Sequence, residues 1–157
     1  MDVRLKMVRH RPNKIWIDAD ACPKAVKEIV FKTSQRLKIK IILVANTYQN
    51  IPQNDLIQLI VVDKSFDAAD QYIIDQVEMH DIVITADIPL AAEVLRKKAR
   101  ALDPRGKIYN ENNIGPISSL RDFMKEFRDA GLITSGPAAF GPKDVKLFAD
   151  SLNKLVS

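Results

Sequence analysis

This 157-residue chain is poor in several features that mark particular classes of protein. Its single cysteine, Cys22, excludes an internal disulfide and fits a reducing compartment, so we expect a cytoplasmic protein. The hydrophobic segments are all shorter than the roughly 18 residues that cross a membrane, and the first residues contain no apolar stretch like that of a signal peptide. We therefore expect no contact with a membrane.

The chain also has only two histidines, His10 and His80. Cys22 precedes a predicted helix start at Pro23, a position that can lower the pKa of a thiol. No histidine lies near it in the sequence to activate it as a nucleophile. Chemistry based on a cysteine and histidine pair is therefore not favoured.

Over most of the chain, neither basic nor acidic residues are in excess. Residues 1–14 hold five basic residues and one acidic residue, and the remainder holds 19 of each sign. The net charge of +4 thus comes from residues 1–14. We predict that residues 1–13 form a flexible basic tail that precedes a single domain over 14–157. Such a tail could touch nucleic acid or an anionic surface, although most tails of this kind are only solvated.

What the chain does have is a regular alternation of short apolar runs and helical periods. The predicted strands cover residues 14–18, 40–45, 57–62 and 81–86, with a short one near 107–109. The predicted helices cover residues 23–37, 66–77, 89–99, about 119–130, and 142–155. Alternation with continuously apolar strands predicts an α/β fold in three layers: a mainly parallel sheet of four to five strands with helices on both faces.

Aspartates gather where these strands end and helices begin. They are Asp18, Asp20, Asp67, Asp70 and Asp87. Open parallel sheets bind ligands beyond the carboxyl ends of their strands, where the strand order reverses. Crowded carboxylates repel one another, and Mg²⁺ or Mn²⁺ removes that conflict because hard cations take oxygen ligands. If the first strand continued to Asp20, that side chain and Asp18 would point to the same side.

Helix capping offers a separate explanation for each aspartate. Asp20 can cap the helix at Pro23, and Asp87 precedes a helix-opening proline. Asp67 and Asp70, three residues apart at a helix start, resemble a capping box. A cation explains in addition why the five would meet at one edge, so we favour a metal site.

Six further residues are weaker candidates for contacting a substrate or phosphate. They are Asn46, Thr85, Arg105, Thr134, Ser135 and Gly136. Asn46 follows the second strand and can reach the crevice, although turn chemistry would also place it there. The TSGP segment offers hydroxyl and backbone donors to a phosphate, but reads equally as a surface turn. The basic run 96–107 can hold a nucleic-acid backbone or form the wet face of a helix.

Several segments in order resemble the bacterial YaiI/YqxD family. They read IWIDADACP, LVAN, FDAADQYI, DIVITADIPLAAEVL, ALDPRG, RDFM and TSGP. That family is grouped with the PIN-like, metal-dependent nuclease folds. The resemblance implies a single PIN-like domain whose acidic residues, at the carboxyl edge of the sheet, bind one or two Mg²⁺ or Mn²⁺ ions.

The resemblance also implies roles for individual aspartates. Asp18 is similar to the first-strand aspartate of PIN-like nucleases, Asp70 to the aspartate that opens a later helix, and Asp87 to the aspartate of their T-x-D-x-x-[LF] motif. Asp20 and Asp67 are additions seen in this family. The glutamate that PIN-like nucleases carry between the first strand and the D-A-x-D helix has no clear counterpart here.

Three hypotheses follow. The leading one is a cytoplasmic Mg²⁺- or Mn²⁺-dependent phosphodiester hydrolase acting on RNA or another nucleic acid. Asp18, Asp20 and Asp87 are its candidate catalytic residues, and all five aspartates are candidate metal ligands. The second is a PIN-like module that binds RNA or a protein without catalysis. The third is a phosphatase resembling haloacid dehalogenases, in which Asp18 attacks phosphorus and Asp20 acts as acid and base; the lysine and the late acidic pair it needs are not evident.

Overall fold

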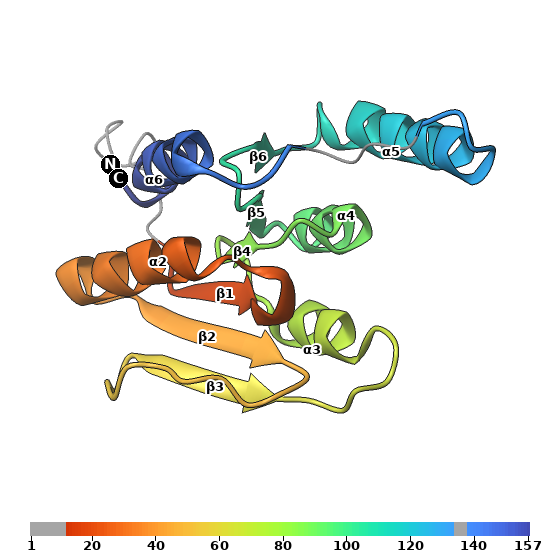
Figure 1. Ribbon diagram of the computed structural model, residues 1–157. Coiled ribbons are helices and arrows are strands. Elements are labelled where there is room, and N and C mark those ends of the chain that lie inside the picture. Colours follow the sequence, from red (N-terminus) through yellow and green to blue (C-terminus); the bar gives the residue numbers. More distant parts are fainter. Residues whose placement is uncertain (1–11, 134–137) are drawn as a thin grey trace, which may run out of the picture.

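The computed structural model describes residues 12–133 and 138–157, and shows strands alternating with helices (Figure 1). The strands are β1 (Lys14–Asp18), β2 (Lys40–Ala45), β3 (Ile57–Val61), β4 (Ile82–Ile84), β5 (Arg100–Leu102) and β6 (Ile108–Tyr109). The helices are a 3₁₀ turn η1 (Ala19–Ala21), α2 (Lys24–Leu37), α3 (Ala68–Gln76), α4 (Ile88–Arg96), α5 (Ile114–Asp129) and α6 (Pro142–Val156). Apart from residues 12 and 13, the predicted N-terminal tail lies outside the described residues.

The six strands form one sheet in the order β3-β2-β1-β4-β5-β6. Neighbouring strands are parallel except for β6, which is antiparallel to β5. The chain builds outward from β1 in one direction and then from β4 in the other, so the strand order reverses between β1 and β4. Ile17 pairs with Ile84 across this junction, which makes Asp18 and Thr85 the next residues along the two strands.

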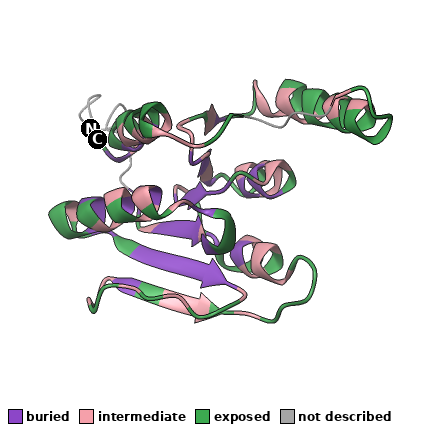
Figure 2. Ribbon diagram, in the orientation of Figure 1, coloured by how far each residue is buried: buried purple, intermediate pink, exposed green. Residues whose placement is uncertain are grey.

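Helices cover both faces of the sheet, because successive side chains of a strand point to opposite sides. Ile17 of β1 packs in one hydrophobic cluster with Phe148 of α6, and α2 joins the same face. Trp16, one residue earlier, packs in a second cluster with Ile73 of α3 and Leu90 of α4. Figure 2 shows that the buried residues concentrate in the central strands between these layers. The predicted three-layer α/β architecture is confirmed.

The sheet has one more strand than predicted, because β5 lies inside the basic run 96–107. The sequence predicts that the preceding helix continues to residue 99, whereas α4 ends at Arg96 and the chain turns into β5. Arg100 accordingly belongs to the framework: its guanidinium donates to the carbonyl oxygens of His80 and Leu155. Three residues are too few to show a strand period.

Helix α5 differs from the others because none of its residues is buried. It begins at Ile114 rather than near residue 119, since Pro116 is accommodated in the first turn, where a missing N–H costs little. Figure 1 shows it extending away from the sheet beyond α4. No helix in the described part of the chain is long and apolar enough to span a membrane.

Candidate functional site

The candidate site begins where β1 and β4 end side by side. Thr85, only 1% exposed, follows β4, and its hydroxyl donates to Asp18 Oδ2 at 2.9 Å. The Thr85 hydroxyl oxygen also accepts the backbone N–H of Asp87 at 2.9 Å. One buried hydroxyl therefore fixes both the carboxylate at the end of β1 and the turn that leads into α4.

Helix α3 brings further carboxylates to this point. Burial, together with the nearby charges of Asp87, Asp18 and Asp67, raises the pKa of Asp70 to about 7. The carboxyl of Asp70 is also within hydrogen-bonding reach of Asp87. Burial likewise raises the pKa of Asp18, the Thr85 hydroxyl opposes this, and Asp87 and Asp20 add to it. These carboxylates are thus close enough to disfavour one another's ionisation.

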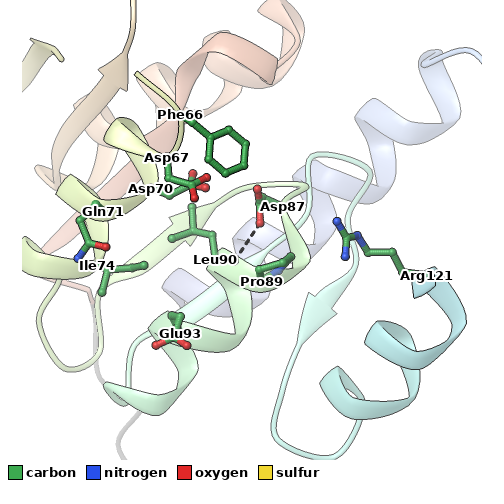
Figure 3. Close-up of a pocket in the computed structure, with 10 residues that line it drawn as sticks. All are labelled: Phe66, Asp67, Asp70, Gln71, Ile74, Asp87, Pro89, Leu90, Glu93 and Arg121. Atoms are coloured by element: carbon green, nitrogen blue, oxygen red, sulfur yellow. Dashed lines mark hydrogen bonds between the residues drawn. The ribbon is translucent and has the colours of Figure 1, made fainter. Parts of the chain in front are cut away.

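Two adjoining cavities open at this edge of the sheet. The first, of about 360 Å³, is lined by all five candidate aspartates together with Asn46 and Lys64. The second, of about 280 Å³, shares Phe66, Asp67, Asp70 and Asp87 with the first. Figure 3 shows this second cavity, with Arg121 reaching toward it from α5. The structure thus places the five aspartates around one depression at the strand-order reversal.

Helix capping accounts for one of these aspartates. Asp87 Oδ1 accepts the backbone N–H of Leu90 at 2.9 Å and so caps α4. Asp67 occupies the N-cap position of α3, but its side chain accepts no capping hydrogen bond, so the expected capping box is absent. The N-cap of α2 is Pro23, and Asp20 does not cap that helix.

Asp20 lies in the 3₁₀ turn η1, because β1 ends at Asp18. The strand period therefore does not relate the two side chains. Asp20 Oδ2 accepts the backbone N–H of Asn46 at 2.7 Å, on the β2 side, whereas Asp18 bonds to Thr85, on the β4 side. The carboxylates of Asp18 and Asp20 therefore lie on different sides of the depression, and each is held by a different neighbouring residue.

The side chain of Asn46 has a hydrogen-bond acceptor that lacks a donor among the described residues. Its side-chain Oδ1 is buried and has no hydrogen-bond partner in the described part of the chain. A buried oxygen without a donor is costly, and a bound cation or water would satisfy it. Asn46 also lines the cavity of the five aspartates, so this unpaired acceptor belongs to a residue at the edge of the same depression.

The remaining weak candidates lie elsewhere. The guanidinium of Arg105 donates to Asp144 Oδ2 at 3.2 Å and to the carbonyl of Ala138 at 2.6 Å, and it lies over the ring of Phe140. It joins the β5–β6 turn to the start of α6 and lines neither cavity. Thr134, Ser135 and Gly136 lie outside the described residues.

Cys22 is not activated by the helix that follows it. The side chain is 8% exposed, and burial raises the pKa of its thiol to about 12 despite the nearby charge of Lys27. The thiol therefore stays protonated near neutral pH, and we assign it to the core.

Among the residues that line the cavities, sequence reasoning missed one exposed aromatic and two basic side chains. Phe66 fits the apolar period of residues 66–77 and so reads as core, but α3 begins at Ala68 and Phe66 is 93% exposed. Lys64 lies in the loop before α3, and Arg121 is brought near only by the packing of α5 against α4. The position of Phe66 beside Asp67, in a turn before the helix, was the sequence signal that could have identified it as a site residue.

The donor chemistry fits a hard divalent cation, since carboxylates and an amide oxygen line one depression. As the side chains stand, no three His, Cys, Asp or Glu residues among those described are close enough together to hold one ion. Exposed side chains change rotamer within nanoseconds, and Asp20 and Asp67 are exposed. A closed ligand set would therefore require at least a rotation of these side chains.

These features define a class: an α/β protein with a mainly parallel sheet and an aspartate-lined depression where its strand order reverses. The chain belongs to the YaiI/YqxD family, described as "Uncharacterized BCR, YaiI/YqxD family", which matches residues 16–157. It is 51% identical over 144 residues to a UPF0178 protein of Maridesulfovibrio salexigens, covering 92% of this chain and 95% of that protein. It is 49% identical to one of Pseudoalteromonas atlantica, covering 92% and 98%. No solved structure matches the chain.

Proposed function

We propose that this protein is a Mg²⁺- or Mn²⁺-dependent phosphodiester hydrolase that acts on nucleic acid, with RNA as the first substrate to test. The observation that carries the proposal is the meeting of five aspartates around one cavity at the strand-order reversal. The resemblance to PIN-like nuclease folds supports the same chemistry. Perturbed carboxyl pKa values in a cleft are also typical of functional sites.

The proposal gives each acidic residue a role. Asp18, Asp70 and Asp87 would hold the cation, and Asp20 and Asp67 would bind it or orient its shell. When bound, the cation would activate water and neutralise charge on the phosphate. Asp70 and Asp87 would give up the hydrogen-bonding contact between their carboxyl groups, since both must then be ionised.

Two neighbouring residues would hold the site in shape. Thr85 restrains Asp18 and the Asp87 backbone through one hydroxyl, so its removal would loosen two ligands together. The backbone N–H of Asn46 fixes Asp20, and its free side-chain oxygen would offer a neutral ligand.

Calorimetry with Mn²⁺ and cleavage of labelled RNA test the proposal together. We expect Asp18→Asn and Asp87→Asn to weaken Mn²⁺ binding at least tenfold and to abolish Mn²⁺-dependent cleavage. Asp75→Asn is the matched control: Asp75 lies on α3, is exposed, and bonds to Gln71 without lining either cavity. Equal cleavage by the wild type and both site variants would overturn the proposal.

Binding without catalysis is the second candidate, and the incomplete acidic set favours it. The glutamate expected of PIN-like nucleases has no clear counterpart, since Glu28 is exposed on α2, Asp55 lies in a loop, and neither lines the two cavities. For the hydrolase to act, Asp20 or Asp67 would have to take its place. RNA binding with no cleavage in Mn²⁺ would support this candidate. The phosphatase hypothesis requires that Asp18 form an aspartyl-phosphate. Trapping of beryllofluoride, an analogue of that phosphoryl group, on Asp18 tests it directly.

A further inference from the structure

The aromatic ring of Phe66 is exposed and does not contribute to the hydrophobic core. At 93% exposure it covers no core, and it lines both cavities. Isolated apolar side chains are common on protein surfaces, so exposure alone carries no meaning. Figure 3 shows the ring beside the carboxylates of Asp67, Asp70 and Asp87. A ligand that contacts both this ring and the neighbouring carboxylates would need an apolar face and a means of tolerating the negative charge.

Positive charges flank this acidic centre within the two cavities. Lys64 lines the 360 Å³ cavity, and Arg121 lines the 280 Å³ cavity. Arg121 points from α5 toward Asp87 in Figure 3. It pairs with the adjacent Asp122 at 3.4 Å, but the two side chains are 46% and 67% exposed, and pairs this open to solvent are weak. Both cations are therefore available to an anionic ligand.

An aromatic platform with cations beside it matches a single nucleic-acid strand. Every base has a π-face that stacks on an aromatic ring, and the backbone phosphates need cations along their path. A strand laid across Phe66 would place phosphates near Lys64 and Arg121 and one between them, over the aspartates. In a duplex the faces of the bases are already stacked on one another and cannot reach the ring.

We propose that Phe66 is a base-stacking platform that selects single-stranded nucleic acid, with Lys64 and Arg121 holding phosphates on either side of the aspartates. The proposal rests on the proposed function for the identity of the phosphate at the centre. Stacking itself requires no cleavage, so the two proposals fail separately.

Fluorescence of a Phe66→Trp protein tests the stacking directly. The native tryptophan, Trp16, is 2% exposed and supplies a constant background. Titration with hexa-adenylate, with and without Mn²⁺, should quench the new indole. Met79→Trp is the matched control, because Met79 is 56% exposed and follows the far end of α3, outside both cavities. The control should show no quenching.

Binding of the same oligonucleotide to variants gives the expected magnitudes. Phe66→Ala should weaken binding about tenfold and Phe66→Tyr should not, as stacking predicts. Lys64→Ala and Arg121→Ala should each lower the slope of log affinity against log salt by about 0.7. Absence of quenching in both conditions, or equal affinity for a duplex, would overturn the proposal.

The cleavage assay separates the two proposals. Quenching with no RNA cleavage by the wild type would leave the stacking platform standing and remove the hydrolase. Cleavage that Phe66→Ala leaves unchanged, with unchanged affinity, would remove the platform and leave the hydrolase.

Discussion

Asp67 holds a backbone conformation that side chains rarely adopt. Its φ of 64° lies in the left-handed region, and its side chain does not cap α3 in return. Aspartate tolerates this region better than most residues, but the strain is not zero. The turn aims the residue into the aspartate-lined depression, so the local cost coincides with the place where we propose a ligand.

Comparing two substitutions at Asp67 isolates that strain. Asp67→Gly and Asp67→Ala both remove the carboxylate, but only alanine has a Cβ that resists the left-handed conformation. We expect the glycine variant to be more stable than the alanine variant by about 1 kcal/mol. Urea denaturation measures the difference. An alanine variant as stable as the glycine variant would show that residue 67 does not keep this conformation.

Individual residues also show which parts of the site could be predicted from the sequence. That Asp18 and Asp87 would lie at one edge follows from their strands alone, because parallel strands end on the same side. The hydrogen bond from Thr85 to Asp18 joins residues 67 positions apart and depends on the exact register of β1 and β4. No local pattern in the sequence encodes that register.

At the scale of elements, the turn between β5 and β6 is tightly fitted against α6. Gly106 has a φ of +99°, and a Cβ built there would lie 2.6 Å from the backbone carbon of Leu147. The hydroxyl of Ser151 also donates to the Gly106 carbonyl. The helix and the turn therefore fit together only because residue 106 has no side chain.

Gly106→Ala should accordingly destabilise the fold by about 2–3 kcal/mol, since it combines left-handed strain with a backbone clash. Gly115→Ala is the control, because a Cβ at Gly115 in α5 meets nothing within 4 Å. Thermal unfolding followed by circular dichroism measures both. A Gly106→Ala protein that unfolds at the wild-type temperature would contradict the observed packing.

Apolar runs bounded by polar turns were predictable, and the three-residue strand β5 was not. The predicted first two strands match β1 and β2 residue for residue, because apolar runs bounded by polar turns are unambiguous. β5 was missed because its three residues adjoin a basic helix end. Phe66 was misplaced because its spacing fits a helical face, although the helix had not yet begun. Spacing reports which residues could share a face, and tertiary contacts decide where the helix starts.

The whole molecule should respond to pH through this cluster. The folded-state pKa of Asp70 is about 7 against an ordinary value of 3.8, so the folded protein binds more protons than the unfolded chain between these pH values. The free energy of unfolding contributed by this group therefore falls as pH rises from about 4 to about 7. Asp70→Asn removes the titrating group and should flatten that fall.

Melting temperatures of chelator-treated protein at pH 5 and pH 7.5 measure this effect. The Asp70→Asn protein should gain stability relative to the wild type at the higher pH, while Asp75→Asn should not. Mn²⁺ at 100 times its dissociation constant should stabilise the wild type by about 2.7 kcal/mol at pH 7.5. The same difference between wild type and Asp70→Asn at both pH values would contradict the assignment.

Because of the strand order, the aspartate-lined depression forms only when both halves of the sheet are present. Within the described residues, the sheet consists of one half built from β1 to β3 and another built from β4 to β6, joined by the crossover helix α3. Asp18 and Asp20 come with the first half, Asp87 with the second, and Asp70 with the crossover. A nascent chain that has emerged only as far as β3 carries two of the five acids. The five aspartates can therefore meet around one depression only after both halves of the sheet have been synthesised and have docked.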